Sequence, residues 1–187
     1  MKKNLLISLK LTLAIILLCS VFYPLLIAGV SKAAPGGGKG ETIIVNGKVV
    51  GYEKIGQSFT GDNYFQGRPS AVNYNAAGSA GSNKGPSNPD YLQVVQDRID
   101  TFLVHNPGVR KEEIPADLVT ASGSGLDPDI SPAAAYVQVK RVATVRSLPE
   151  QKVKALVDRH IQKPLAGLLG PSRVNVLKLN IALDELK

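Results

Sequence analysis

Residues 11–31 read LTLAIILLCSVFYPLLIAGVS, a run of 21 residues without a charged side chain. At about 1.5 Å of rise per residue, a helix of this length spans roughly 31 Å, which matches the hydrocarbon core of about 30 Å in a lipid bilayer. A helix also satisfies its backbone hydrogen bonds within the segment, as a membrane requires. Pro24 lies inside the run, and transmembrane helices tolerate such a proline. The run therefore predicts one membrane-spanning helix.

The lysines around this run predict its orientation. Three lysines precede the run and two follow it: Lys2, Lys3 and Lys10, then Lys32 and Lys39. Because the cytoplasmic flank of a membrane helix carries the excess of positive charge, residues 1–10 are expected in the cytoplasm. The two later lysines weaken this bias without reversing it. The chain after residue 31 is therefore expected outside the cytoplasm.

A cleaved signal peptide is the alternative interpretation of the run. Its apolar region is typically about 7–15 residues long and ends at a small-residue cleavage site. This run is longer, and Ser31-Lys32-Ala33 fits such a site poorly. Lipoprotein processing at Cys19 is also disfavoured, because Leu18 stands where a small residue is expected. We therefore expect the helix to remain as an anchor, with Cys19 as a small apolar side chain within it.

Composition limits the function of the rest of the chain. The 187 residues carry a formal net charge of +7, and the three N-terminal lysines supply much of it. No dense basic run and no tryptophan accompany this charge, so anionic membrane lipid is an expected partner and nucleic acid is not. A single cysteine excludes an internal disulfide.

The segment after the anchor predicts a tether and then a hairpin. Residues 32–40 are rich in glycine and have no capacity to pack, which is typical of a flexible tether. Two apolar runs, 42–45 and 48–52, flank Asn46-Gly47. Because Asn-Gly tolerates positive φ and suits a type I′ turn, the pattern predicts a β-hairpin.

Residues 56–89 contain mainly glycine, serine, asparagine and proline. A stretch of this length without periodicity is either disordered or a structured functional loop. Tyr64, Phe65 and Tyr74 favour the structured loop, because aromatic side chains can anchor a loop onto a core.

Helical periodicity predicts three helices. The first covers about 89–105, with Asn88 as its N-cap and Pro89 in its first turn. The second runs from Ser131-Pro132 to about residue 146, and Ser147-Leu148-Pro149-Glu150 is a capping-box pattern that opens the third, which Pro164 stops. The expected apolar faces are Leu92, Val95, Ile99 and Phe102 on the first helix, and Val153, Leu156, Val157 and Ile161 on the third.

Two further segments are predicted as strands, 114–120 and 173–179, with a loop over 121–129 and a short helix at the end of the chain. Strands followed by helices and another strand indicate an α+β domain. The expected fold is thus a single N-terminal transmembrane helix followed by one small extracytoplasmic α+β domain over residues 41–187.

Catalytic and metal-binding patterns are mostly missing from the sequence. One cysteine and two isolated histidines, His105 and His160, do not form a zinc-type cluster, and neither a nucleophile motif nor a Walker A motif occurs. Asp127 and Asp129 could share a cation, but a turn at Asp127-Pro128 followed by a helix N-terminus is the favoured interpretation. The Gly123-Ser124-Gly125 backbone could bind a phosphate, although such loops are common. The residues alone indicate a binding or assembly role.

Four segments resemble one family of proteins. They are Tyr64 to Ala71, Gly81 to Pro89, Asp117 to Pro132 and Arg173 to Asn180. In this order behind one anchor, they are similar to the C subunit of the Kdp potassium-transporting ATPase, over about residues 51–184 and the anchor. The chain departs from the family pattern at Ala80, across 161–166, at Gly170-Pro171-Ser172-Arg173 and in the tether.

The resemblance implies a bacterial complex that uses ATP to import potassium. Its partners would be a channel-like subunit that selects potassium and a P-type ATPase subunit. We expect the anchor to pack against the channel-like subunit in the bacterial plasma membrane and the outer domain to cover its entrance. Arg68, Asn83, Asn88 and Asp127 would hold that interface or the domain's own fold, and neither alternative is preferred. No covalent cofactor is implied, and ATP would act through the complex.

The family is also described as a catalytic chaperone that binds ATP and raises the nucleotide affinity of the ATPase subunit. Ser147 and Gln151 would carry that role, because Ser147-Leu148-Pro149-Glu150-Gln151 faintly resembles an ABC-transporter signature. A domain outside the cytoplasm cannot reach cytoplasmic ATP, so the topology favours a non-catalytic accessory subunit.

Overall fold

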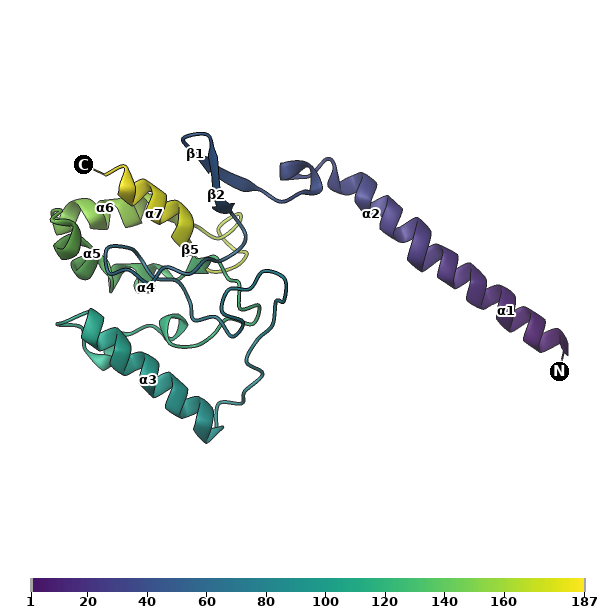
Figure 1. Ribbon diagram of the computed structural model, residues 1–187, viewed down its shortest axis with the longest axis horizontal. Coiled ribbons are helices and arrows are strands. Elements are labelled where there is room, and N and C mark those ends of the chain that lie inside the picture. Colours follow the sequence, from purple (N-terminus) through teal and green to yellow (C-terminus); the bar gives the residue numbers. More distant parts are fainter. Residues whose placement is uncertain (1, 187) are drawn as a thin grey trace. The chain divides into compact units, whose positions relative to one another are not determined.

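The computed structural model describes residues 2–186, which divide into an N-terminal unit that ends at Thr42 and a C-terminal unit that starts at Ile43 (Figure 1). The N-terminal unit contains one continuous helix with three parts: α1 (Lys2–Leu17), the π-helical turn η1 (Leu18–Phe22) and α2 (Tyr23–Ser31). In the described part of the chain it is the one helix that is long and apolar enough to cross a membrane.

The helix starts before the predicted membrane span. It begins at Lys2, so most of the flank predicted as 1–10 is helical and continues the span of Leu11 to Ser31. Pro24 lies in the first turn of α2, directly after η1. A proline has no N–H to donate and its ring crowds the preceding turn, so the wider π turn accommodates it without ending the helix.

Turns join the anchor to the next strand. The short 3₁₀ turn η2 (Pro35–Gly38) contains Gly36 and Gly37 at φ values of 77° and 60°. These values lie in the left-handed region that glycine adopts without a steric penalty, which explains why the tether is rich in this residue.

The C-terminal unit contains the predicted hairpin, β1 (Thr42–Val45) and β2 (Lys48–Tyr52). Asn46 and Gly47 have φ values of 50° and 77°, as a type I′ turn requires. The prediction of a hairpin with this turn is confirmed.

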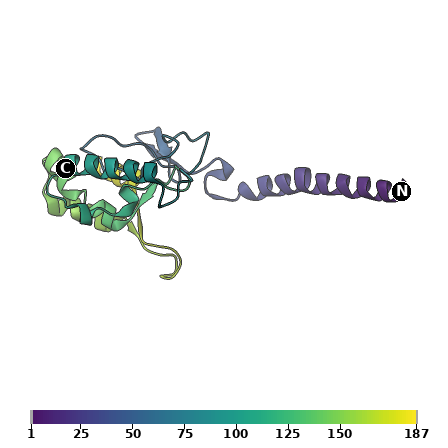
Figure 2. The same ribbon diagram turned by 90° about the horizontal axis from the view of Figure 1, so that it is seen from below.

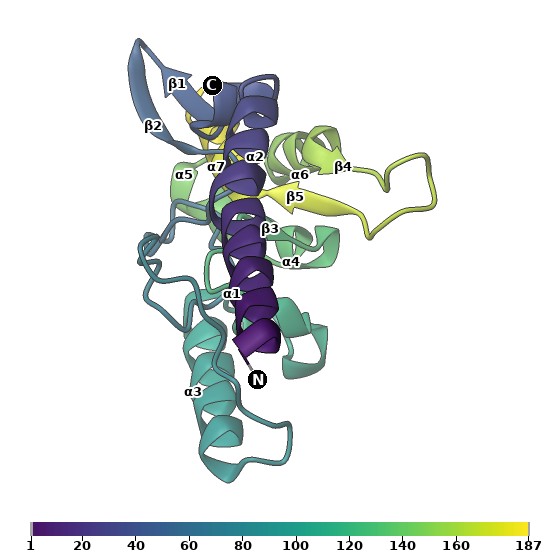
Figure 3. The same cartoon turned by 90° about the vertical axis from the view of Figure 1, so that its right-hand side faces the viewer.

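A second, three-stranded antiparallel sheet has the order β3-β5-β4 (Figure 3), formed by β3 (Asp129–Ile130), β4 (Ile161–Gln162) and β5 (Arg173–Asn175). Val174 of β5 pairs with Ile130 on one side and with Ile161 on the other. Between β4 and β5 the segment 163–172 runs away from the rest of the unit, as Figures 2 and 3 show.

Four helices pack around this sheet: α4 (Pro132–Tyr136), α5 (Val139–Arg146), α6 (Glu150–His160) and α7 (Val176–Asp184). Their apolar faces meet in one core that contains Val142, Val153, Val157, Val174, Leu179 and Leu183. Helix α3 (Pro89–His105) contributes Phe102 to this core. The structure confirms a long apolar helix followed by a mixed domain of helices and a small sheet.

The N-terminus of α3 is as predicted, because the Asn88 side chain accepts a hydrogen bond from the Tyr91 N–H at 3.0 Å. The predicted apolar face of α3 is only partly right. Phe102 is buried, but Leu92 is 53% exposed. The amphipathic pattern thus identifies the helix without showing how little of it the core covers.

The predicted strand over 114–120 is wrong. Two 3₁₀ turns occupy the region, η3 (Lys111–Glu113) and η4 (Ala116–Leu118), with Pro115 between them. Pro115 cannot donate to a strand ladder, and the Asp117 carboxylate instead accepts hydrogen bonds from the backbone and hydroxyl of Ser131.

The predicted strand over 173–179 is right only for its first three residues. The Asn175 side chain accepts from the Lys178 N–H at 3.0 Å, which caps α7 and ends the strand. The chain therefore changes from strand to helix at the polar residue Asn175.

The predicted second helix is divided into α4 and α5. The Gln138 side-chain amide donates to the Ala134 carbonyl at 2.9 Å. That carbonyl is the acceptor that the Gln138 backbone N–H would use in a continuous α-helix, so the side chain competes with the helix at this point.

The predicted capping box at Ser147 is also wrong. Ser147 ends α5 with a φ of 54°, and α6 has Pro149 at its N-cap position without a side-chain cap. The predicted start of α6 at Glu150 is nevertheless correct.

Candidate functional site

The backbone of residues 62–66 is held inside the domain by buried side chains. Phe65 is fully buried, its N–H donates to Asn180 Oδ1 at 2.9 Å, and its carbonyl accepts from Asn180 Nδ2 at 2.9 Å. These two hydrogen bonds resemble the pairing of one β-strand residue with its neighbour. Because buried backbone groups need partners, Asn180 of α7 allows a loop to enter the core.

Gln138 repeats this arrangement one residue further along the loop. Its Oε1 accepts from the Gln66 N–H at 2.8 Å, and its Nε2 donates to the Gln66 carbonyl at 3.1 Å. Gln138 is completely buried at the junction of α4 and α5. The loop is therefore clamped by one amide side chain from α7 and another from the turn between α4 and α5.

Arg141 of α5 holds the start of the same segment. Its Nη1 donates to the carbonyls of Asp62 and Tyr64 at 2.6 and 3.0 Å, and its Nε donates to Asn106 Oδ1 at 2.9 Å. Burial lowers the pKa of Arg141, and the Asp62 carboxylate, 3.8 Å from Nη1, opposes that shift. A guanidinium with this many acceptors fixes the loop rigidly.

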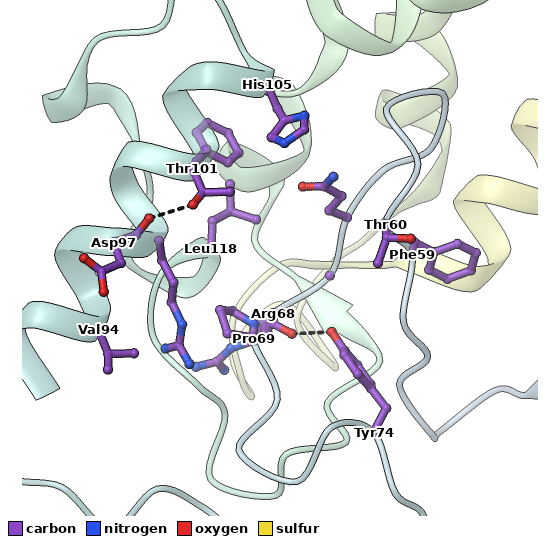
Figure 4. A pocket seen from close by; sticks show the side chains of 14 residues that line it. Phe59, Thr60, Arg68, Pro69, Tyr74, Val94, Asp97, Thr101, His105 and Leu118 are labelled. Atoms are coloured by element: carbon purple, nitrogen blue, oxygen red, sulfur yellow. Dashed lines mark hydrogen bonds between the residues drawn. The ribbon is translucent and has the colours of Figure 1, made fainter.

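A cavity of about 510 Å³ lies between this loop and α3 (Figure 4). Phe59, Phe102 and Leu118 give it apolar walls, and Arg68, Asp97, Arg98 and His105 add charged or titratable groups. Thr101 and Asp97 come from one face of α3, while Arg68 and Tyr74 reach the cavity from the loop (Figure 4). We refer to this cavity as the α3 pocket.

The polar groups of the α3 pocket contact nearby backbone and side-chain groups. The Thr101 hydroxyl donates to the Asp97 backbone carbonyl at 2.8 Å, which is an ordinary contact within a helix. His105 Nδ1 lies 3.2 Å from Asp62 Oδ2, so the neighbour of the imidazole is a carboxylate. Within residues 2–186, no three acidic, histidine or cysteine side chains are placed to hold a metal ion.

Arg68 and Asp127, two of the predicted site residues, form an ion pair. Arg68 Nη1 lies 3.0 Å from Asp127 Oδ2, and both side chains are about a quarter exposed. The Tyr74 hydroxyl donates to the Arg68 carbonyl, and burial, aided by the charge of Asp127, raises the pKa of Tyr74. The pair joins the loop at 68–74 to the loop before β3, so Arg68 and Asp127 help to hold the domain together.

Asp127 and Asp129 do not share a site in the way that a cation would need. Asp127 Oδ1 accepts from the Asp129 N–H at 3.0 Å, as in a turn, and Asp129 Oδ2 lies 3.1 Å from Arg173 Nε. Burial raises the pKa of Asp129, while Arg173 opposes the rise. Each carboxylate therefore has its own guanidinium.

The other predicted site residues lie away from the α3 pocket. Asn83 is exposed with a φ of 52°, and Asn88 caps α3. Ser147 is exposed at the end of α5, and Gln151 is exposed in the first turn of α6 beside Glu150. Glu150 adds a negative charge to the first turn of α6, which disfavours a phosphate at that helix N-terminus.

Sequence reasoning missed Gln138, Arg141 and Asn180, which hold the backbone of residues 62–66 in place. Their partners lie 72, 79 and 115 residues away along the chain. One signal was available for Arg141, because it lies in a helix between Val139 and Val142, both of which are buried. An arginine placed among core positions needs several acceptors.

Comparison with known proteins identifies the family. The profile of KdpC, described as the c chain of K⁺-transporting ATPase, matches residues 5–185. A potassium-transporting ATPase KdpC subunit from Flavobacterium psychrophilum is 65% identical over 185 residues, covering 99% of this chain and 100% of the relative. Relatives with the same name from Bacteroides fragilis and Caldanaerobacter subterraneus are 53% and 52% identical, covering 99% and 96% of this chain and 98% and 94% of their own lengths. This chain belongs to the KdpC family, the C subunits of the Kdp potassium-transporting ATPase.

Proposed function

We propose that this chain is a non-catalytic assembly subunit of an ATP-driven potassium import complex. In this proposal the anchor helix packs against the potassium-selecting subunit within the membrane. The domain lies outside the cytoplasm and covers the entrance of that subunit. The P-type ATPase subunit would be the chain that hydrolyses ATP.

The anchor carries this proposal. From Lys2 to Ser31 the structure describes a 30-residue apolar helix whose most apolar window has none of its residues buried. A helix in lipid gains little from lipid contact alone, and association with other helices depends on side-chain packing and hydrogen bonds. All faces of this anchor are available for that packing.

The clamped loop supports a docking role for the domain. The hydrogen bonds from Asn180, Gln138 and Arg141 fix residues 62–66 before any partner arrives. A preformed surface loses less conformational entropy on binding than a mobile loop, which favours a stable interface.

A scrambled anchor tests the proposal. The residues at 11–31 are shuffled so that length and composition stay the same while the packing faces are lost. The tagged variant should still enter the membrane fraction but should no longer co-purify the potassium-selecting subunit. The matched control is Cys19→Ser, one conservative change in the same helix, which should retain both partners.

Two outcomes would contradict the proposal. If the scrambled anchor keeps both partners, the helix is only a tether. If the full chain binds ATP and loses that binding in Ser147→Ala and Gln151→Ala, the catalytic-chaperone role is supported instead.

A further inference from the structure

The hairpin loop between β4 and β5 exposes a cluster of leucines. Leu165, Leu168 and Leu169 are 73%, 87% and 65% exposed, and the segment 163–172 projects from the domain (Figures 2 and 3). We call these three side chains the leucine tip. Leucines scattered singly over a surface are ordinary, but three at the end of one projection form a patch that water solvates poorly.

The leucine tip has a defined backbone. Leu165 and Leu169 exchange two N–H···O=C bonds of 3.0 Å each, and the amides of Gly167 and Leu168 donate to the carbonyls of Pro164 and Leu165. An amide that already has a partner loses little when water is removed. The tip can therefore enter an apolar phase without exposing unpaired amides at those four positions.

The hairpin that carries the tip has only positive charges in its own sequence, and its Arg173 pairs with Asp129 of β3 at 3.1 Å. Lys163 is exposed on one arm of the hairpin and Arg173 lies on the other, while the sequence from Ile161 to Leu183 has no acidic residue. Between Lys163 and Ser172 no side chain offers a hydrogen bond. Specific protein interfaces carry several direct hydrogen bonds, so an apolar tip with flanking cations fits an anionic lipid surface better.

The chain itself keeps this tip close to a bilayer. Residues 32–41 between the anchor and β1 extend over at most about 36 Å. A globular unit of the size of residues 43–187 has a radius of gyration of about 15 Å. The tether is therefore long enough for any face of the domain to turn toward the membrane, and too short for the domain to leave it.

We propose that the leucine tip inserts into the membrane interface on the side where the domain lies, with Lys163 beside the headgroups of anionic lipids. The insertion gives the domain a second membrane attachment beside the anchor helix. This proposal rests on the anchor and not on the assembly role. It concerns how the domain is held against the lipid surface.

A single tryptophan can report the insertion, because the native chain contains none. The Leu168→Trp full chain is reconstituted in vesicles that contain anionic phospholipid. Its tryptophan should fluoresce at a shorter wavelength there than in the same chain when it is denatured without detergent. Phospholipids that carry a nitroxide on the acyl chain should quench it. The matched control is Val104→Trp on α3, where the native side chain is 78% exposed, and it should show neither effect.

Further variants test the chemistry of the tip. In the Leu168→Trp background, Leu165→Ser together with Leu169→Ser should abolish quenching, while circular dichroism stays unchanged. Lys163→Gln should lower the ratio of inserted to free tips about fivefold in anionic vesicles. The same substitution should have little effect in neutral vesicles.

The proposal is overturned if Leu168→Trp behaves like Val104→Trp in both kinds of vesicle. It is also overturned if the tryptophan becomes shielded only when the other subunits of the complex are co-reconstituted and no lipid probe quenches it. That second result would assign the tip to a protein partner.

Discussion

At the scale of single residues, Asp129 shows a competition between burial and ion pairing. Burial raises its pKa, Arg173 lowers it, and the charges of Asp127 and Glu53 raise it further. The pKa of Asp129 is raised overall, although Arg173 Nε lies 3.1 Å from Asp129 Oδ2. Loss of water around the half-buried carboxylate therefore outweighs an ion pair whose arginine is 56% exposed.

This competition predicts a pH dependence. Because the folded-state pKa is raised, the contribution of Asp129 to stability is complete below its unfolded-state pKa of about 3.9 and is lost as pH rises through the folded-state pKa. Asp129→Asn cannot ionise, so its stability relative to the native chain should increase as pH rises through this window. Urea unfolding of both full chains in detergent, repeated across this pH range, measures the difference.

The control for that experiment is Asp100→Asn, at an exposed position on α3. Its free energy of unfolding relative to the native chain should change less with pH. A constant difference for Asp129→Asn, or one with the opposite slope, would mean that the ion pair with Arg173 governs the site.

Polar residues in the core were the part of the site that sequence patterns could not predict. Asn180 lies in α7 and Gln138 at the start of α5, beside apolar positions that are easily recognised, but an amide side chain has no periodicity of its own. The role of a buried amide depends on which loop backbone lies beside it. Phe65, the partner of Asn180, is 115 residues away along the chain. The sequence does indicate Phe65 as a loop anchor, because an aromatic side chain gains stability from burial whatever its partner is.

At the scale of elements, the junction of α5 and α6 stores backbone strain. Ser147 has a φ of 54°, and the Leu148 N–H reaches back to the Ala143 carbonyl at 2.9 Å, as in a Schellman ending. A side chain in the left-handed region costs roughly 1–2 kcal/mol that glycine does not. The position therefore suits glycine better than serine.

Ser147→Gly should stabilise the domain by about 0.5–1 kcal/mol, since relief of this strain exceeds the extra unfolded-state entropy of glycine. Urea denaturation should show a higher midpoint with an unchanged slope. Ser172→Gly is the control, because Ser172 does not have a positive φ and should lose stability instead. A loss of stability in Ser147→Gly would show that the serine side chain itself is needed.

Elements with local signals were predicted well, and elements set by distant contacts were not. Asn46-Gly47 and the Asn88 cap determine a hairpin and a helix start from adjacent residues alone. By contrast, β3 and β4 are two residues long each and are formed by pairing with β5. Four of the six residues from Val174 to Leu179 are apolar, a pattern that suits a strand or a helix, and the Asn175 cap decides where the strand ends.

At the scale of the whole molecule, orientation decides between the two roles that the family resemblance implies. An extracytoplasmic domain can cover the entrance of a potassium-selecting subunit but cannot reach cytoplasmic ATP. A cytoplasmic domain could reach ATP but could not cover that entrance. The lysines before the anchor favour the first orientation.

Cysteine labelling tests the orientation, because Cys19 is the single cysteine in the chain and can be changed to serine. In that background Val104→Cys places a thiol on α3 at a position where the native side chain is 78% exposed, so access to a small charged maleimide depends on topology rather than burial. It should react in intact cells, whereas Lys2→Cys should react only after the membrane is permeabilised. If the two variants show the reverse pattern, the domain faces ATP, and both the lysine argument and the assembly proposal at the outer face are wrong.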